Sequence, residues 1–162
     1  MCVDQDYSGK PFCSIRQENL IAYTTSMKQC SSSAAQCPDG QSLDPGNCGC
    51  ASSYNGKMVF RAPSFVDVTT GEPFQQLEMS LSTQLNLRPG SVYLSDVHWN
   101  SDNYLQVQVK LFPSSGMSFN LSELTRIGFD LSNQTYKPPS NFGPYFFIAD
   151  PYAPLSGNWI LP

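Results

Sequence analysis

The sequence predicts an α+β fold, in which two helices cover one face of a four-stranded antiparallel sheet. A small cysteine-rich segment precedes this fold in the chain. One strand is clear at Tyr104–Phe112, because apolar and polar residues alternate there and successive strand side chains point to opposite faces. Its apolar positions are Leu105, Val107, Val109 and Leu111. This apolar face needs a cover, and two flanking stretches have the helical spacing to supply it, Pro73–Asn86 and Asn120–Leu131.

The cysteines divide the chain into parts. All six lie in the first third of the 162 residues, at Cys2, Cys13, Cys30, Cys37, Cys48 and Cys50. The periodic spacing of aromatic and aliphatic residues begins only near Ala51. The first fifty residues therefore have too few apolar side chains for a stable core, and we expect disulfides to stabilise them instead. The sequence therefore predicts a disulfide-rich segment at 1–50, an α+β domain at 51–153 and a tail at 154–162.

The cysteines and two N-glycosylation sequons indicate secretion. The sequons are Asn120-Leu121-Ser122 and Asn133-Gln134-Thr135. A net charge of −4 with few basic residues leaves no electrostatic footprint for a phosphate backbone, so nucleic acid is not an expected partner. The sequence has no apolar run of about 18 residues and no signal peptide ahead of Cys2, so we expect any targeting or membrane segment to have been trimmed away.

Turn-forming residues dominate the cysteine-rich segment. A bond between Cys2 and Cys13 would close a short loop and stabilise the fold by roughly 3 kcal/mol. Ile15–Lys28 has no clean period, so we assign no element to it. Cys30–Cys50 is rich in Ser, Asp, Gly, Pro and Asn, which favour turns, and we expect an irregular disulfide-held segment there.

The first half of the domain predicts a strand and then a helix. Met58–Ala62 is a short strand candidate that Pro63 ends, because proline cannot donate to a sheet ladder. The helix starts within Thr70–Pro73, with its cap at the first or second of these residues and the proline in the first turn. Pro89-Gly90 stops it, and its apolar face consists of Phe74, Leu77, Leu81 and Leu85.

The second half predicts a hairpin, a helix and a last strand. Val92–Trp99 is joined to the clear strand described above by the polar turn Asn100–Asn103, so the two should pair antiparallel. Asn120 and Glu123 have the spacing of a capping pair for the second helix. The apolar face of that helix consists of Leu121, Leu124, Ile127 and Leu131. Tyr145–Ala149 is the last apolar strand.

This β-α-β-β-α-β order is the ferredoxin-like arrangement. It gives the strand order 4-1-3-2, with the strand at 104–112 inside the sheet. SEA domains share this order, and Pro89-Gly90-Ser91-Val92 resembles their self-cleaving Gly-Ser. In SEA domains the cleaved bond lies between the second and third strands, whereas here it lies ahead of the second. Turn formation therefore explains these residues better.

Cys48-Gly49-Cys50 is the most suggestive chemical feature. A disulfide across one residue is strained, and strained exposed disulfides are labile and regulatory. The alternative is that Cys48 and Cys50 bond to Cys30 and Cys37, which covers two of the three possible pairings and gives an inert structural role. Zinc bound by these four thiolates is a third alternative that secretion disfavours, so we expect no metal and no cofactor.

The remaining residues form no catalytic constellation. His98 is the only histidine, and no Gly-x-Ser-x-Gly elbow is present to act with it. No spacing singles out a carboxylate pair among Glu72, Glu78, Asp96, Asp102, Glu123, Asp130 and Asp150. The aromatic residues near the end form either a sugar-binding platform or, as is more common, a core. They are Tyr136, Phe142, Tyr145, Phe146, Phe147 and Tyr152.

Two stretches, Arg126–Pro139 and Phe142–Ala149, resemble the extracellular juxtamembrane region of plant leucine-rich-repeat receptor-like kinases of subfamily VIII, closest to the vascular-related members. Further matches are Cys48–Ala51, Phe60–Phe65, Leu77–Leu81 and Pro89–Val92. The resemblance implies a segment between the last repeat and a membrane helix, with a cytoplasmic serine/threonine kinase beyond. Residues 154–162 would then lead toward the membrane.

The resemblance also implies roles for the cysteines. Cys2 and Cys13 would finish the repeat solenoid and cover its exposed apolar end. The four later cysteines match a cysteine-rich patch that relatives are thought to use in sensing extracellular hydrogen peroxide or quinones. The chain departs from that patch, because six residues separate Cys30 from Cys37 where relatives have a close pair.

The sequence thus supports three hypotheses for function. The first is a non-catalytic module on the apoplastic side of the plasma membrane, which positions the ligand-binding repeats and offers a face to a co-receptor or a second copy. The second is a redox sensor in which Cys30, Cys37, Cys48 and Cys50 change pairing. The third is a secreted hydrolase, which requires an acidic pair in a cleft. Cell-wall carbohydrate is a further candidate partner, through the aromatic residues.

Overall fold

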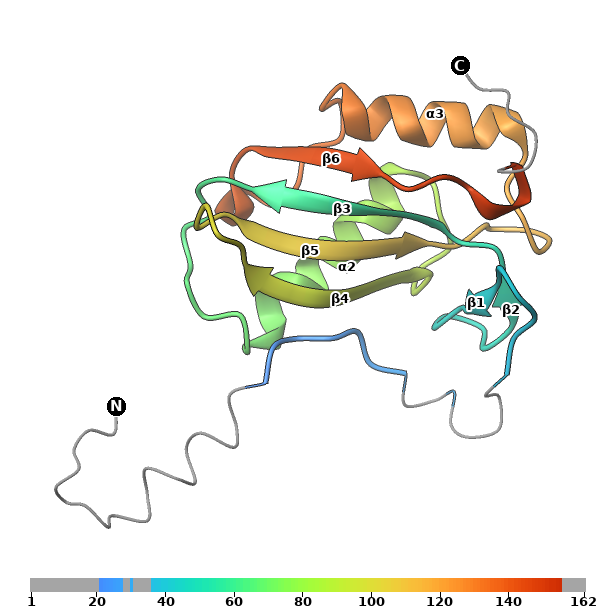
Figure 1. The fold of residues 1–162 in the computed structure, drawn as a ribbon, viewed down its shortest axis with the longest axis horizontal. Helices are drawn as coiled ribbons and strands as arrows, with labels where there is room; N and C mark the ends of the chain where they lie inside the picture. The colour runs from blue at the N-terminus through green and yellow to red at the C-terminus, as the bar shows by residue number, and fades with distance from the viewer. Residues whose placement is uncertain (1–20, 28–29, 31–35, 156–162) are drawn as a thin grey trace, which may run out of the picture.

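The computed structural model describes residues 21–27, 30 and 36–155, and it has the predicted α+β fold (Figure 1). Its main elements are β3 (Tyr54–Phe60), α2 (Gly71–Gln84), β4 (Val92–Trp99), β5 (Leu105–Leu111), α3 (Leu121–Ser132) and β6 (Tyr145–Ala149). The β-α-β-β-α-β order is confirmed, and β4 and β6 have the predicted bounds. In Figure 1, α2 crosses behind the sheet and α3 runs beside β6.

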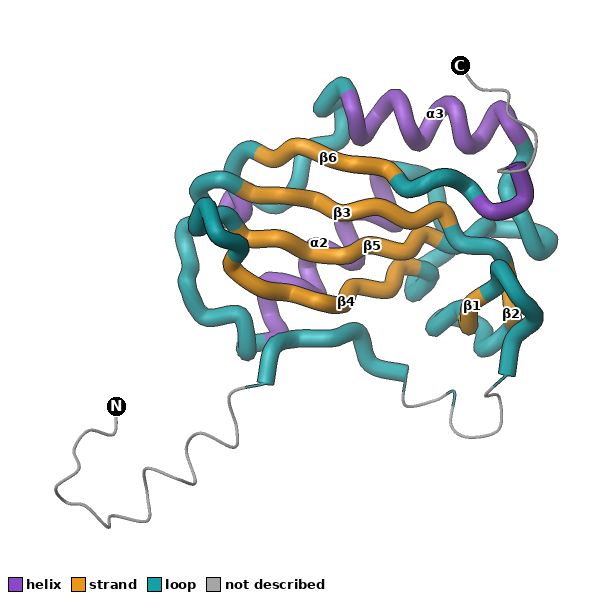
Figure 2. The backbone as a smooth tube through the Cα atoms, viewed as in Figure 1, coloured by secondary structure: helices purple, strands orange, loops and turns teal. Residues whose placement is uncertain are grey.

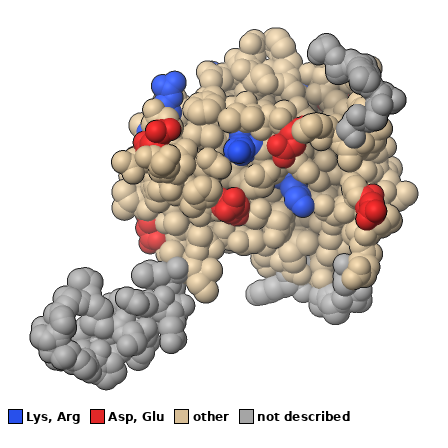
Figure 3. Space-filling view, in the orientation of Figure 1, with Lys and Arg blue, Asp and Glu red and all other residues tan. Residues whose placement is uncertain are grey.

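The four strands pair antiparallel in the order β4-β5-β3-β6, which is the predicted order read from the other edge. Directly opposed residues of antiparallel strands share a face, so Met58 and its partner Val107 both face the helices. The opposite surface is called the open face here. Its residues are Tyr93, Ser95, His98, Gln106, Gln108, Lys110, Asn55, Lys57, Val59, Phe146 and Ile148. The charges on it are few and scattered (Figure 3).

Strand β3 begins four residues before the predicted Met58 and ends at Phe60. The early start was missed because Tyr54-Asn55-Gly56-Lys57 contains glycine and asparagine, which are poor strand formers. Pairing on both sides overrides this local preference, since Gly56 lies opposite Val109 of β5 and Ala149 of β6. A Cβ at Gly56 would lie 2.5 Å from Phe147 Cζ, so the glycine makes room for that ring.

Helix α2 starts where the sequence predicts, with Thr70 at the N-cap. The Thr70 hydroxyl caps nothing in the helix and donates instead to Asp67 Oδ2 at 2.9 Å. The helix buries the predicted apolar face against the sheet, and Phe74, Leu77, Leu81 and Leu85 are all fully buried. That burial is the main source of its stability, since an isolated helix of this length is marginal in water.

Helix α3 has the predicted capping box. Glu123 N donates to Asn120 Oδ1 at 2.8 Å, and Asn120 N donates to Glu123 Oε1 at 3.0 Å. Two backbone N–H groups that have no partner within the helix are thereby satisfied. The helix buries Leu124, Ile127 and Leu131.

Replacing Asn120 with alanine should lower the free energy of unfolding by about 1 kcal/mol, because the helix loses its cap. The same change destroys a sequon, so Ser122→Ala is the matched control, which removes the sequon and keeps the cap. Urea unfolding of deglycosylated protein should separate the two variants, with Ser122→Ala close to wild type. Equal destabilisation in both would contradict the capping role.

One apolar core lies between the sheet and the helices. Four of the six aromatic residues near the C-terminal end are buried in or against it, at Tyr136, Phe142, Tyr145 and Tyr152. Phe142 lies in a 3-10 turn, Ser140–Phe142, and packs on Phe60 at a ring-centroid distance of 4.8 Å. Phe147 is half-buried, and only Phe146 is exposed. These residues therefore belong mostly to the core and do not form an exposed platform.

The cysteine-rich segment is not wholly irregular. It contains a two-stranded antiparallel sheet of β1 (Ser42–Leu43) and β2 (Cys50–Ala51), although most of it is loop (Figure 2). Neither strand was predicted, because two residues are too few to show an alternation. Within the described ranges, no helix has the length and apolar character needed to cross a bilayer.

Candidate functional site

Residues 21–27 form a strap that crosses the domain at the β4 edge of the sheet (Figure 1). Thr25 N donates to Leu94 O at 3.0 Å, and Leu94 N donates to Thr25 Oγ1 at 2.7 Å. Tyr23 N donates to Val68 O at 2.8 Å, in the loop ahead of α2. The strap thus satisfies backbone groups of an edge strand that would otherwise be open to pairing with another chain.

The strap is also held by Glu78, which lies on α2. The hydroxyls of Tyr23 and Thr25 both donate to Glu78 Oε2, each at 2.6 Å. The Tyr23 ring stacks on Phe74 with ring centroids 5.3 Å apart. Burial raises the pKa of the Glu78 carboxyl above its ordinary value of 4.5, although the two hydroxyl donors act in the opposite direction. Burial and the Glu78 carboxylate likewise raise the pKa of Tyr23.

Replacing Glu78 with glutamine should remove a pH dependence of stability. The folded-state pKa of Glu78 lies above 4.5, so the native chain binds this proton more tightly than the unfolded chain. The Glu78 contribution to stability is therefore greatest below 4.5 and decreases as pH rises through the raised pKa.

Urea unfolding between about pH 4 and pH 7 tests this expectation. Wild type should lose stability relative to Glu78→Gln as pH rises. Glu72→Gln removes one charge from the exposed first turn of the same helix and serves as the control. A difference between wild type and Glu78→Gln that does not vary with pH would contradict the assignment.

A buried ion pair, called the joint here, fastens the cysteine-rich segment to the α+β domain. Asp44 lies between β1 and β2, its side chain is 2% exposed, and it pairs with Arg88 Nη2. Arg88 lies between α2 and β4, and its Nη1 donates to Pro113 O at 3.3 Å and Ser114 O at 3.0 Å. Asp44 Oδ1 accepts from Gly46 N at 2.8 Å. Each carboxylate oxygen therefore has a donor, as a buried charge requires.

The backbones approach closely at the joint. A Cβ on Gly46 would lie 3.1 Å from the carbonyl carbon and oxygen of Gly90, so this position favours glycine. Further along, Ser52 N donates to Met117 O at 2.9 Å, and Tyr152 Oη donates to Ser52 O at 3.2 Å. The joint and the close approach of Gly46 to Gly90 thus hold the described part of the cysteine-rich segment against the domain, and the Ser52 contacts fix the residues that follow it.

Two disulfides lie in the described part of the cysteine-rich segment, and they cross. Cys30 bonds to Cys48 and Cys37 bonds to Cys50, so Cys48 and Cys50 are not joined to each other. Cys48 and Cys50 thus bond to Cys30 and Cys37, which is the alternative that gives the four cysteines a structural role. Cys2 and Cys13 lie outside the described residues.

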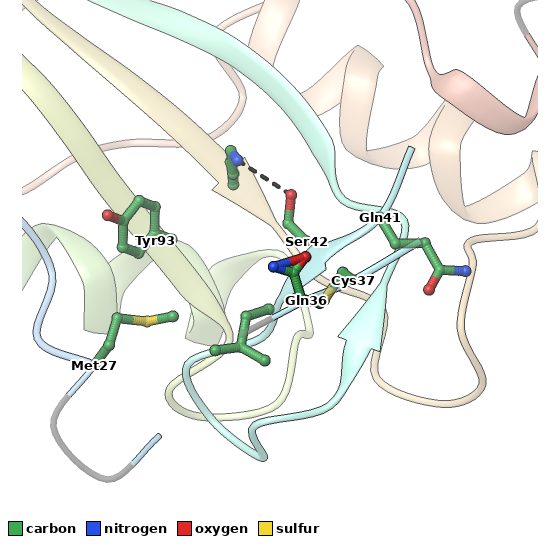
Figure 4. Close-up of a pocket in the computed structure, with 8 residues that line it drawn as sticks. Met27, Gln36, Cys37, Gln41, Ser42 and Tyr93 are labelled. Atoms are coloured by element: carbon green, nitrogen blue, oxygen red, sulfur yellow. Dashed lines mark hydrogen bonds between the residues drawn. The ribbon is translucent and has the colours of Figure 1, made fainter. Parts of the chain in front are cut away.

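A cavity of about 430 Å³ lies where the strap, the cysteine-rich segment and the open face meet (Figure 4). Its lining residues are Met27, Gln36, Cys37, Gln41, Ser42, Leu43, Tyr93 and Lys110. Lys110 Nζ donates to Ser42 Oγ at 3.1 Å, which is the dashed line in Figure 4. A second hollow of about 300 Å³ is lined by the proline-rich loop ahead of β6.

The other predicted site residues are dispersed. His98 Nδ1 lies 3.5 Å from Asp96 Oδ1, and both side chains are largely exposed. Among the described residues, no group of three or more His, Cys, Asp or Glu side chains could hold a metal ion. Asn120 and Asn133 are exposed and lie at the two ends of α3.

Sequence reasoning missed the strap and the joint. Their partners are far apart along the chain, by 44 residues for Asp44 and Arg88 and by 53 for Thr25 and Glu78. Asp44-Pro45-Gly46 has turn chemistry, which indicated a bend there but not an ionic partner.

Relatives of the chain among known proteins include two receptor-like kinases. A probable leucine-rich repeat receptor-like protein kinase of Arabidopsis thaliana is 29% identical over 160 residues, which cover 96% of this chain and 16% of that protein. A probable LRR receptor-like serine/threonine-protein kinase of the same plant is 26% identical over 121 residues, 70% of this chain and 13% of that protein. No family model and no solved structure matches. Over nearly its whole length, the chain is thus similar to a short region of plant leucine-rich repeat receptor-like kinases.

Proposed function

We propose that the chain is a non-catalytic extracellular module of a plant receptor-like kinase of subfamily VIII, close to the vascular-related members. In this role it lies on the apoplastic side of the plasma membrane, between ligand-binding repeats and a membrane helix that residues 154–162 approach. The two Arabidopsis relatives support this proposal, since both are receptor-like kinases far longer than the region matched. Two disulfides agree with a location outside the cytoplasm.

The proposed task is to hold the repeats at a fixed angle to the membrane. The observation that carries this proposal is the joint, because Asp44 of the cysteine-rich segment is buried against Arg88 of the domain. The strap adds a second attachment through Glu78. Residues on the N-terminal side are therefore fastened at two places, and Cys2 and Cys13 would close the repeat solenoid just ahead of them.

A flexible insertion in the receptor tests this task. A Gly/Ser insert of roughly twelve residues after Ser53 lets the cysteine-rich segment move, provided that Asp44→Asn and Arg88→Met release the joint and that Tyr23→Phe and Thr25→Ala remove the strap's bonds to Glu78. The same insert after Ser115, in an exposed loop beside Gly116, lengthens the chain without separating the two parts. Signalling should fall only for the first receptor, at equal amounts on the cell surface. Equal signalling by both receptors would rule out a positioning role.

We also propose N-linked glycans on Asn120 and Asn133. Both side chains are exposed, and the amide oxygen that caps α3 remains available when the amide nitrogen carries a sugar. Glycans at the two ends of α3 would shield that helix and leave the open face for a co-receptor or a second copy. Intact mass before and after deglycosidase treatment shows whether each site is occupied.

The second candidate is a redox sensor for hydrogen peroxide or quinones. The observation in its favour is that Cys37 and Cys50 are only half-buried, and Cys37 lines the cavity of Figure 4. A disulfide has no thiolate for peroxide to oxidise, so sensing requires that one pair be reduced at rest. Counting free thiols on unreduced protein from plant cells separates the candidates. Thiols that mild peroxide removes would favour the sensor, and cysteines that are all bonded would exclude it.

A further inference from the structure

The cavity of Figure 4 has the composition of a binding site for an acidic sugar, and the position of Lys110 is the first reason. Among the described residues, Lys110 is the one charged residue that lines the cavity. Its side chain is half-buried, and Ser42 Oγ takes one hydrogen bond. No carboxylate among the described residues lies within ion-pair distance of it. An ammonium group has three donors, so a bound anion can accept those that Ser42 leaves free.

The walls of the cavity supply the contacts that a sugar ring needs. Tyr93 lies directly opposite Lys110 in the β4–β5 register, and its ring faces the cavity beside Met27 in Figure 4. Aromatic rings stack on the apolar faces of sugar rings while their hydroxyls hydrogen-bond. Gln36 and Ser42 lie on the opposite wall and offer an amide and a hydroxyl to sugar hydroxyl groups, whereas Gln41 points away (Figure 4).

The volume of the cavity and the charge around it restrict the class of ligand further. A volume of about 430 Å³ accommodates one or two sugar units. The chain carries a net charge of −4, yet none of the described residues that line this cavity is acidic. An anion is therefore favoured here and disfavoured over most of the remaining surface.

We propose that this cavity binds a uronic acid unit, with the sugar carboxylate on Lys110, the ring against Tyr93 and the hydroxyls toward Gln36 and Ser42. The site stands on the cavity alone and does not depend on the receptor assignment. Cys37 lines the same cavity, so an occupant also shields the Cys37–Cys50 disulfide from solvent.

Titration of the full chain with galacturonate, followed by NMR, tests the proposal, with galactose as the matched neutral sugar. Galacturonate should bind more tightly than galactose, and added salt should weaken its binding. Lys110→Gln should weaken galacturonate binding by about tenfold or more, since a charge-assisted hydrogen bond is lost. Lys57→Gln removes a lysine from the same open face but outside the cavity, and it should leave the affinity unchanged.

Three results would overturn the proposal. They are galactose binding as tightly as galacturonate, Lys110→Gln retaining wild-type affinity, and acetate competing at equal concentration, which would indicate a simple carboxylate site. A second readout uses the disulfides. Galacturonate should slow the reduction of Cys37–Cys50 by dithiothreitol, followed by alkylation and mass spectrometry, and should leave Cys30–Cys48 unaffected as an internal control.

Discussion

Replacing Arg88 with methionine should destabilise the chain by about 3 kcal/mol, because the change leaves a buried carboxylate without its cation. Asp44 is 2% exposed, so water cannot take over the role of the guanidinium without opening the joint. The two hydrogen bonds from Arg88 to Pro113 O and Ser114 O are lost as well. Urea unfolding followed by circular dichroism measures the loss.

The double variant Asp44→Asn with Arg88→Met is the control for this prediction. Asparagine keeps the oxygen that accepts from Gly46 N, and it buries no charge. The double variant should therefore recover roughly half or more of the lost stability, as is typical when both members of a buried pair become neutral. A single variant as stable as wild type would show that the pair is solvated and that the cysteine-rich segment moves freely.

Replacing Phe142 with alanine should cost about 3–5 kcal/mol, because it empties the middle of an aromatic cluster. The Phe142 side chain is 0% exposed, and its ring lies 4.8 Å from Phe60, 5.1 Å from Phe65 and 5.7 Å from Phe74 between centroids. These rings belong to β3, to the loop after it and to α2. The 3-10 turn that carries Phe142 thus closes one end of the core.

Two further variants serve as controls for the Phe142→Ala prediction. In Phe142→Leu, leucine fills most of the space that alanine would leave empty, so this variant should lose distinctly less stability than the alanine variant. Phe146→Ala removes a neighbouring aromatic ring from the open face, where it is 36% exposed, and should have a small effect. Equal losses for Phe142→Ala and Phe146→Ala would show that the turn does not seal the core.

The sequence predicted those parts of the fold that depend on neighbouring residues. The alternation in β5, the polar turn ahead of it and the Asn120–Glu123 spacing are all local, and the structure confirms each. The strand order followed from the hairpin and the two helical crossovers, which leave few topologies open.

What the sequence could not predict depends on packing between distant segments. The start of β3 is formed by pairing with β5 and β6 against its own composition. The joint and the strap each need a partner more than 40 residues away along the chain, and neither Asp44 nor Thr25 differs locally from any surface residue. The cavity is formed by the strap, the cysteine-rich segment and the sheet, so it exists only once all three are in place.

The crossed disulfides have a consequence for a protein exposed to proteases. A single cut between Cys37 and Cys48 leaves Cys30 and Cys37 on one fragment and Cys48 and Cys50 on the other, so two covalent bridges still link the fragments. A cut elsewhere between Cys30 and Cys50 leaves at least one bridge. A single cut between Cys30 and Cys50 therefore cannot by itself release the part of the chain that lies N-terminal to it. Release requires a reductant as well as a protease.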